Sequence, residues 1–121
     1  MRFAVIIAGT RTFDDFDLLC RKCDVFFSDK KPTAIICGEA RGADTLGRRY
    51  AEDHGISVES YPADWDHYGR SAGFIRNKEM ASRADALVAF WDGKSRGTKN
   101  MIEIARSKGI PIRVVMIEQE G

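Results

Sequence analysis

The sequence has no long apolar run and no strong excess of charge. Its N-terminal apolar stretch covers only about six residues from position 3, too short for a membrane span or a signal-peptide core. The formal net charge is +1, so the chain as a whole shows no electrostatic attraction to nucleic acid or membrane. We therefore expect a cytoplasmic protein with no membrane partner and no nucleic-acid partner.

Cysteine and histidine are too scarce to suggest a disulfide framework or a metal centre. The 3 cysteines are an odd number. Cys20 and Cys23 have CxxC spacing, but they fall inside a predicted helix rather than after a strand. The two histidines, His54 and His67, show no paired spacing. We interpret these cysteines and Cys37 as packing residues, and we expect no metal and no resident cofactor.

Neither of the two best-known nucleotide fingerprints is present. No GxGxxG motif follows the first predicted strand, and the glycines within residues 93–99 are too close together for a Walker A loop. The segment from Gly38 to Gly42 contains no lysine. Neither a dinucleotide-dependent dehydrogenase nor ATP hydrolysis is predicted.

What the sequence does contain is a regular alternation of predicted strands and helices. Strands are predicted over residues 3–8, 33–37, 56–61, 86–91 and 112–117, and helices from Asp14 or Asp15 to 27 and over 43–54, 72–83 and 99–108. The continuous apolar runs indicate strands buried on both faces. This order predicts an α/β fold, a Rossmann-like three-layer sandwich in which helices cover both faces of a five-stranded, mostly parallel sheet. A single domain over residues 1–121 is expected.

The second half of the chain carries more local expectations. Residues 62–70 are predicted to be the longest irregular stretch, and Ser71 to cap the helix that follows. The tail from residue 118 is expected to fray. The helix after Ser71 is expected to bury Phe74, Ile75, Met80 and Ala84.

The loops after the first four predicted strands are rich in glycine, arginine and carboxylates. Carboxyl ends of parallel strands share one edge of a sheet, which is where such folds bind ligands. Guanidinium groups bind phosphate in a bidentate way, and helix starts present backbone N–H groups to anions. This edge is therefore predicted to bind a phosphate-bearing ligand. The arginines that gather there are Arg11, Arg41, Arg70, Arg76 and Arg96.

Aromatic residues near this edge have two interpretations. Trp65, His67 and Tyr68 would stack on a base or cover the site, or Trp65 and Tyr68 would pin their loop by packing on the sheet. His67 is also the one near-neutral proton carrier expected there. Trp91, at the end of a predicted core strand, is interpreted as structural.

Four motifs stand in a fixed order along the chain: Ala8–Arg11, Cys37–Asp44, Arg76–Met80 and Ala89–Thr98. In this order and spacing they resemble the YspA-like branch of the SLOG superfamily, and the resemblance covers nearly the whole chain. The superfamily also contains the Lonely Guy phosphoribohydrolases and the DprA recombination mediators. The resemblance implies a Rossmann-like sheet, a nucleotide or nucleotide-derived ligand, and a homodimer or larger homo-oligomer.

The Lonely Guy enzymes cleave the base from nucleoside 5′-monophosphates with an arginine motif and a glycine-rich motif that ends in Gly-Thr-x-x-Glu. Arg76 and Met80 look similar to the first motif, and Gly97-Thr98 to the end of the second. The chain departs from the enzymes at Met101, which stands where they have the glutamate. Glu103 lies two residues further on, about half a turn away on a helix.

The favoured hypothesis is a sensor or sequestering protein that binds a nucleotide or nucleotide-derived ligand. The alternative is hydrolysis of a nucleotide N-glycosidic bond, for which the candidate catalytic residues are Arg76, Glu39, Asp92 and Glu103. A DNA-associated role by analogy with DprA is a third hypothesis, which the near-neutral charge disfavours. The predicted ligand-binding residues are Gly9, Thr10, Arg11, Gly38, Glu39, Arg41, Gly42, Asp44, Arg76, Asn77, Asp92, Gly93, Gly97 and Thr98.

Overall fold

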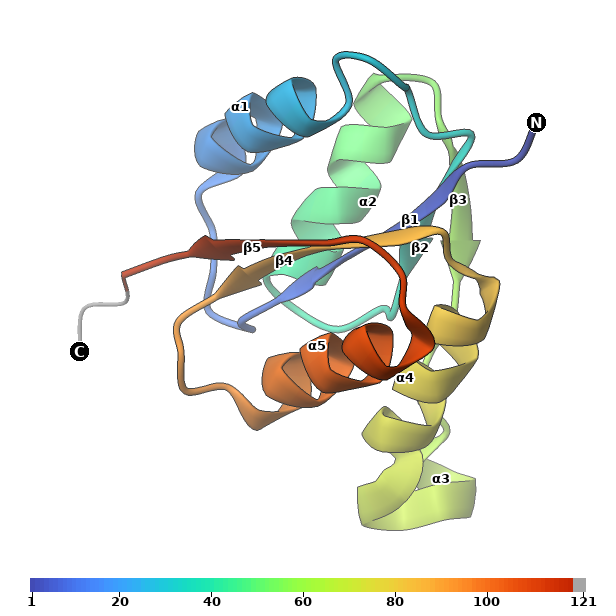
Figure 1. The fold of residues 1–121 in the computed structure, drawn as a ribbon. Coiled ribbons are helices and arrows are strands. Elements are labelled where there is room, and N and C mark those ends of the chain that lie inside the picture. Colours follow the sequence, from blue (N-terminus) through green and yellow to red (C-terminus); the bar gives the residue numbers. More distant parts are fainter. Residues whose placement is uncertain (119–121) are drawn as a thin grey trace.

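The computed structural model describes residues 1–118, and one sheet of five parallel strands runs through it (Figure 1). The strands are β1 (Ala4–Gly9), β2 (Ala34–Cys37), β3 (Ser57–Ser60), β4 (Ala86–Trp91) and β5 (Ile112–Met116). Their spatial order is β3-β2-β1-β4-β5, so the strand order reverses between β1 and β4. Of the tail expected to fray from residue 118, residues 119–121 lie outside the described residues.

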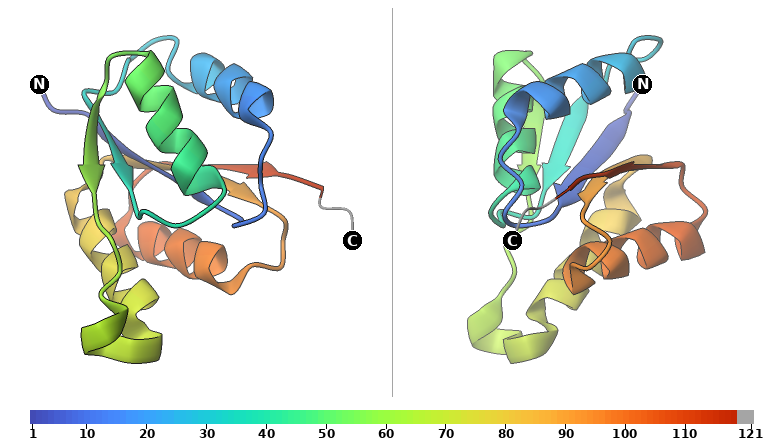
Figure 2. Two further views of the ribbon diagram at one scale, coloured as in Figure 1. Left: turned by 180° about the vertical axis from the view of Figure 1, so that it is seen from behind. Right: turned by 90° about the vertical axis from the view of Figure 1, so that its left-hand side faces the viewer.

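Two pairs of helices cover the two faces of the sheet (Figure 2). Helices α1 (Phe16–Phe26) and α2 (Ala43–Asp53) lie on one face, and α4 (Ala72–Arg83) and α5 (Arg96–Lys108) lie on the other. The predicted fold class, a five-stranded parallel sheet between helices, is confirmed. None of the helices in residues 1–118 is long and apolar enough to cross a membrane.

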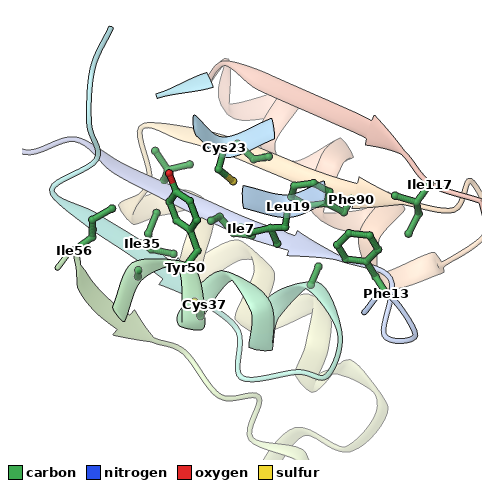
Figure 3. Packing of buried hydrophobic residues seen from close by; sticks show 14 residues of the cluster. Ile7, Phe13, Leu19, Cys23, Ile35, Cys37, Tyr50, Ile56, Phe90 and Ile117 are labelled. Atoms are coloured by element: carbon green, nitrogen blue, oxygen red, sulfur yellow. The ribbon is translucent and has the colours of Figure 1, made fainter. Parts of the chain in front are cut away.

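The alternation of side chains along β1 divides the core into two layers. Val5 and Ile7 pack with α1 and α2, whereas Ile6 packs with α4 and α5. Figure 3 shows the first layer, in which Leu19 of α1 and Tyr50 of α2 belong to the same cluster as Ile7. Because both faces are covered, the central strands need apolar residues at every position, which explains their continuous apolar runs.

The helix ends largely follow signals in the sequence. Asp15 caps α1, since its carboxylate accepts a hydrogen bond from the backbone N–H of Leu18 at 3.0 Å. Gly109 ends α5 with a φ of 74°, in the left-handed region that glycine adopts without strain. Both ends are where the sequence places them.

The segment between β3 and α4 differs from the prediction. Residues 62–70 are not irregular, because they contain helix α3 (Trp65–Tyr68) and enter the 3-10 turn η1 (Gly69–Ser71). Asp64 caps α3 through a 3.1 Å hydrogen bond from the backbone N–H of His67. Ser71 makes no side-chain cap on α4, because η1 runs directly into α4 and gives Ser71 a helical backbone. Helix α3 projects from the body of the molecule (Figure 1).

The starts of α5 and α4 bring two further corrections. Helix α5 begins at Arg96 rather than Lys99, so Gly97 and Thr98 belong to its first turn. On α4, Met80 is buried as predicted, but Phe74 is 48% exposed. Ile75 and Ala84 are half-buried. Helical periodicity identifies the apolar face but does not say whether that face meets the core or a cavity.

Candidate functional site

A cavity of about 510 Å³ opens at the carboxyl edge of the sheet. It is lined by the loops that follow β1 and β4 and by residues from the starts of α2, α4 and α5. Doubly wound sheets bind their ligands in the crevice where the strand order reverses, which here lies between β1 and β4. The volume is in the range of small-molecule sites.

Thr10 joins the two central loops of this edge. Its Oγ1 accepts hydrogen bonds from the backbone N–H of Asp92 at 3.1 Å and from the hydroxyl of Ser95 at 3.2 Å. Thr10 is buried, so these contacts are shielded from water. The loop after β1 therefore holds the loop after β4 in place.

The loop after β4 is a tight turn built around Asp92. The Oδ1 of Asp92 accepts hydrogen bonds from the backbone N–H groups of Lys94 and Ser95, both at 2.8 Å, and these bonds lower the pKa of Asp92. Trp91 donates its indole N–H to the carbonyl of Ser95 at 3.1 Å. This contact agrees with the structural role predicted for Trp91.

Helix α5 points its amino end at the cavity without a side-chain cap. Its N-cap residue Ser95 makes no capping hydrogen bond, and Arg96, Gly97 and Thr98 of the first turn line the cavity. First-turn N–H groups have no acceptor within a helix, and the helix dipole makes this end partly positive. By contrast, aspartates cap α1 and α3. The start of α5 therefore offers hydrogen-bond donors to an anion.

Arg76 and Asn77 connect α4 with the neighbouring elements. The guanidinium of Arg76 donates to the carbonyl of Gly38 and to Asn77 Oδ1, the latter at 3.1 Å. Asn77 Nδ2 donates to Asn100 Oδ1 at 2.9 Å and to the carbonyl of Gly97 at 3.3 Å. Burial lowers the pKa of Arg76, while Asp44 opposes that shift. These bonds hold the cavity side of α4 against β2 and α5.

Asp44 is a buried carboxylate in the cavity wall. It is 5% exposed and lies in the first turn of α2, where its Oδ2 accepts a hydrogen bond from the backbone N–H of Ala40 at 3.3 Å. Burial raises the pKa of Asp44 to about 6, although Arg76 acts in the opposite direction. Because its bond goes to the loop before α2, Asp44 does not cap its own helix.

Gly42 allows a backbone conformation and a close contact that a side chain would prevent, and it does not line the cavity. Its φ is 74°, and a Cβ there would lie 2.6 Å from the carbonyl carbon and oxygen of Arg11. The loop before α2 therefore packs directly on the loop after β1. Gly38 is similarly crowded, since a Cβ there would lie 2.9 Å from Asp44 Oδ2.

Several predicted site residues lie outside the cavity lining. Glu39 is turned to its own partners, because its Oε1 accepts hydrogen bonds from Arg48 at 2.6 Å and Ser60 at 2.7 Å. Glu103 faces solvent, with Lys99 3.9 Å away. The other predicted residues that do not line the cavity are Gly38, Arg41, Gly42 and Gly93.

The structure brings the remaining predicted residues together around the cavity, and Arg70 and Arg96 join them. Those predicted residues are Gly9, Thr10, Arg11, Asp44, Arg76, Asn77, Asp92, Gly97 and Thr98.

Sequence reasoning placed Trp65 near this edge but missed the rest of the apolar lining. Met80 and Met101 are buried and line the cavity, and the half-exposed Trp65 and Phe74 also contribute. Gly73, Arg76, Asn77 and Met80 are spaced three, four and seven residues apart, which places them on one face of α4. That spacing was the available signal, since Arg76 was already assigned to the site.

Cys20 and Cys23 lie within α1 and do not line the cavity. Burial raises the pKa of Cys23 to about 12 and also raises the pKa of Cys20, so neither thiol is activated. Within residues 1–118, no cluster of three histidine, cysteine, aspartate or glutamate side chains is arranged to hold a metal ion.

Comparison with known proteins finds a family, a relative and a solved structure. The family model for the YspA, cpYpsA-related SLOG family matches residues 3–68. Gene 61 protein of Mycobacterium phage D29 is 34% identical over 118 residues, with 89% of this chain and 92% of that protein covered.

The third match is a solved structure, DNA processing protein A (DprA) from Streptococcus pneumoniae. It has a TM-score of 0.72 and 14% identity, and covers 94% of this chain and 50% of that chain. This chain thus spans half of the DprA chain, and at this identity the likeness shows the fold alone.

Proposed function

The chain belongs to the YspA, cpYpsA-related SLOG family, and on this premise we propose that it binds a nucleotide or nucleotide-derived ligand in the cavity. Membership of the family suggests binding or processing of a nucleotide-related ligand. The finer proposal is a sensor or sequestering protein, which holds such a ligand without turning it over.

The observation that carries this proposal is the uncapped start of α5 beside arginines that form no ion pair within residues 1–118, although Arg76 already donates to the carbonyl of Gly38 and to Asn77. Arg11, Arg70, Arg76 and Arg96 line the cavity, and none of them belongs to the ion pairs found among residues 1–118. Free first-turn N–H groups and guanidinium forks together suit a phosphate group.

The apolar lining supports a ligand that is more than a phosphate. Met80 and Met101 offer a buried apolar surface, and Trp65 and Phe74 offer aromatic faces. A nucleobase is planar and mostly apolar on its faces, so it suits such a surface. Phosphate donors and an apolar wall in one cavity match the two ends of a nucleotide.

Isothermal titration of the purified chain with AMP, GMP, CMP and UMP tests the proposal. At least one of them should bind and raise the melting temperature, and inorganic phosphate should compete with it. Mass spectrometry of small molecules that copurify with the chain extends the test to modified nucleotides. The absence of binding throughout, with no copurifying nucleotide-like molecule, would contradict the proposal.

A matched pair of variants on α5 locates the site. Arg96 and Arg106 are both exposed on this helix, but only Arg96 lines the cavity. Arg96→Ala should weaken nucleotide binding about tenfold, the usual scale for a charge-assisted hydrogen bond, and Arg106→Ala should leave it unchanged. Equal effects of the two substitutions on affinity would show that the nucleotide does not bind beside Arg96.

The alternative, N-glycosidic hydrolysis, is supported by two carboxylates in the cavity whose pKa values are shifted in opposite directions. Burial raises the pKa of Asp44, and backbone hydrogen bonds lower that of Asp92, a pattern typical of acid and base pairs. Against it, Met101 occupies the position of the Lonely Guy glutamate. Chromatography for free base after incubation with nucleoside monophosphates distinguishes turnover from binding alone.

We further propose that residues 1–121 form one cytoplasmic domain that assembles as a homodimer or larger homo-oligomer. One sheet links all the described elements, and the edge strand β5 exposes Val114 and Met116. Light scattering coupled to size exclusion tests the assembly, and a monomer at all concentrations would contradict it.

A further inference from the structure

Asp44 is the feature of the cavity that phosphate binding does not explain. Its carboxylate is almost completely buried and yet lines a cavity rich in arginine. A carboxylate repels a phosphate, so it would weaken the binding of an anion placed beside it. A buried charge is costly unless it is paired or hydrogen-bonded. Asp44 therefore needs a role that suits an acceptor.

The protein satisfies the carboxylate only in part. Oδ2 accepts the N–H of Ala40, and the guanidinium of Arg76 and a backbone hydrogen bond from Gly38 also lower the pKa of the carboxyl group. Arg76 itself donates hydrogen bonds to the carbonyl of Gly38 and to Asn77 Oδ1. It forms no ion pair within 4.0 Å among residues 1–118. The carboxylate thus retains capacity to accept hydrogen bonds from a ligand in the cavity.

The position of Asp44 separates it from the phosphate donors of α5, although not from Arg76. Asp44 comes from α2 on one face of the sheet, whereas Arg96 and Gly97 come from α5 on the other. The apolar lining comes mainly from α3, α4 and α5. A nucleotide with its phosphate at α5 and its base on the apolar lining presents its sugar to the remaining wall, and the sugar hydroxyls are donors.

We infer that Asp44 accepts hydrogen bonds from the ribose hydroxyl groups of the ligand, so that the cavity selects ribonucleotides over nucleotides without these hydroxyls. This inference rests on the proposed function. Acidic residues bind ribose hydroxyls in the same way in dinucleotide sites of other doubly wound sheets. A ligand without the hydroxyls leaves a buried acceptor unpaired, which disfavours its binding.

The preference for ribose should depend on pH. A hydroxyl donor favours the ionised carboxylate, and burial raises the pKa of Asp44 to about 6. The other charged or titratable groups facing Asp44 are Arg76 from α4, Glu39 from the loop before α2, and Cys37 from β2. Hydrogen bonds lower the pKa of Glu39, burial raises that of Cys37 to about 12, and Arg76 keeps its charge. Between pH 5 and 8, Asp44 is therefore the member of this group that changes charge.

The test compares a ribonucleoside monophosphate with its 2′,3′-dideoxy counterpart, using the base that binds best. Titration calorimetry at pH 8 should show at least a tenfold preference for the ribonucleotide, and the preference should shrink at pH 5. Asp44→Asn should reduce the preference to less than threefold at both pH values while the dideoxy nucleotide still binds. Asp53→Asn, which removes the same charge from the exposed end of α2, should keep the wild-type preference.

Several outcomes would overturn the inference. Equal affinity of the wild type for both nucleotides would do so without any variant, even if Asp44→Asn failed to fold. A preference that persists in Asp44→Asn would assign the hydroxyls to another residue. Tighter binding of inorganic phosphate by Asp44→Asn would place the phosphate beside Asp44. A wild-type protein that binds no nucleotide at all would instead contradict the proposed function, and the inference with it.

Discussion

The amino and carboxyl edges of the sheet use their polar side chains in different ways. At the amino edge, polar groups are matched to partners within the protein. Arg2 donates two hydrogen bonds to Glu59, at 2.5 and 2.9 Å. Asp85 accepts the backbone N–H of Ala4, and Thr33 accepts that of Phe3, each at 2.9 Å. These contacts hold the ends of the strands together.

At the carboxyl edge, some polar groups hold the loops and others are left for a ligand. Thr10, Asp92 and Asn77 connect loops and helices, as the residues of the amino edge do. Arg11 and Arg96, by contrast, line the cavity without an ion pair in residues 1–118. A binding site therefore differs from the rest of the polar surface in having hydrogen-bond donors that folding leaves without an acceptor, and polarity alone does not identify it.

The largest expected effect on ligand affinity comes from introducing a carboxylate into the first turn of α5. A side chain at Gly97 meets open space, so Gly97→Asp should fold normally and stabilise the helix start by about 0.5 kcal/mol. The same carboxylate should repel the ligand phosphate and weaken binding about 100-fold, or about 3 kcal/mol. Calorimetry measures the affinity and thermal melting the stability. Gly97→Ala is the control. If Gly97→Asp bound the nucleotide with wild-type affinity, the phosphate would not bind at the start of α5.

Asp44 should make the stability of the protein depend on pH. Its folded-state pKa of about 6 lies above the unfolded value, so the folded state binds more protons between these values. Wild-type stability should therefore fall as pH rises from 4 through 6, relative to Asp44→Asn, by about 2 kcal/mol. Urea unfolding of both proteins at pH 4 and pH 7.5 measures this difference, because other carboxylates cancel. Parallel pH profiles would show that Asp44 does not titrate in this range.

A change at the amino edge should affect stability alone. Asp85→Ala removes the acceptor of the Ala4 N–H, and we expect a loss of about 1 kcal/mol in the free energy of unfolding. Nucleotide affinity should stay within twofold of the wild type, because Asp85 lies at the opposite edge. Asp85→Asn retains an acceptor oxygen and should recover most of the stability. A large loss of affinity in Asp85→Ala would mean that the two edges are coupled.

The smallest effect is expected at Glu103. Its contact with Lys99 is 3.9 Å long, and both side chains are more than half exposed, so Glu103→Gln should change stability by less than about 0.5 kcal/mol. Nucleotide binding, and any release of free base, should also be unchanged because Glu103 does not line the cavity. Thermal melting and chromatography check both points. Reduced base release would restore Glu103 as a catalytic candidate.

The parts of the site that sequence predicts are those set by local signals and by strand direction. The strand runs, the cap at Asp15 and the stop at Gly109 follow from short-range patterns. Once the sheet is parallel, the loops that contain Thr10 and Asp92 must share an edge. The role of Thr10 as a link between these loops was not predicted, because it depends on a hydrogen bond between residues 82 positions apart.

Side-chain direction within the loops is harder to predict. Glu39 has a φ of 61°, a left-handed conformation that is uncommon for a residue with a side chain. Its carboxylate meets Arg48 of α2 and Ser60 of β3 instead of the cavity. Partners that come from two distant elements decide this orientation, and the loop sequence contains no sign of them.

The α/β class, the alternation of strands and helices, and the family can be predicted without a structure, because continuous apolar runs, caps and spaced motifs are local properties of the chain. Only the tertiary structure decided which donors remain for a ligand. Arg41 and Arg96 both belong to glycine-containing loop sequences, yet only Arg96 lines the cavity. Asp44 was predicted at this edge from its loop, but Met101 joins it in the cavity because helices from opposite faces of the sheet meet where the strand order reverses. The physical reason is that burial and hydrogen-bond pairing depend on neighbours brought together by folding, not on neighbours in the chain.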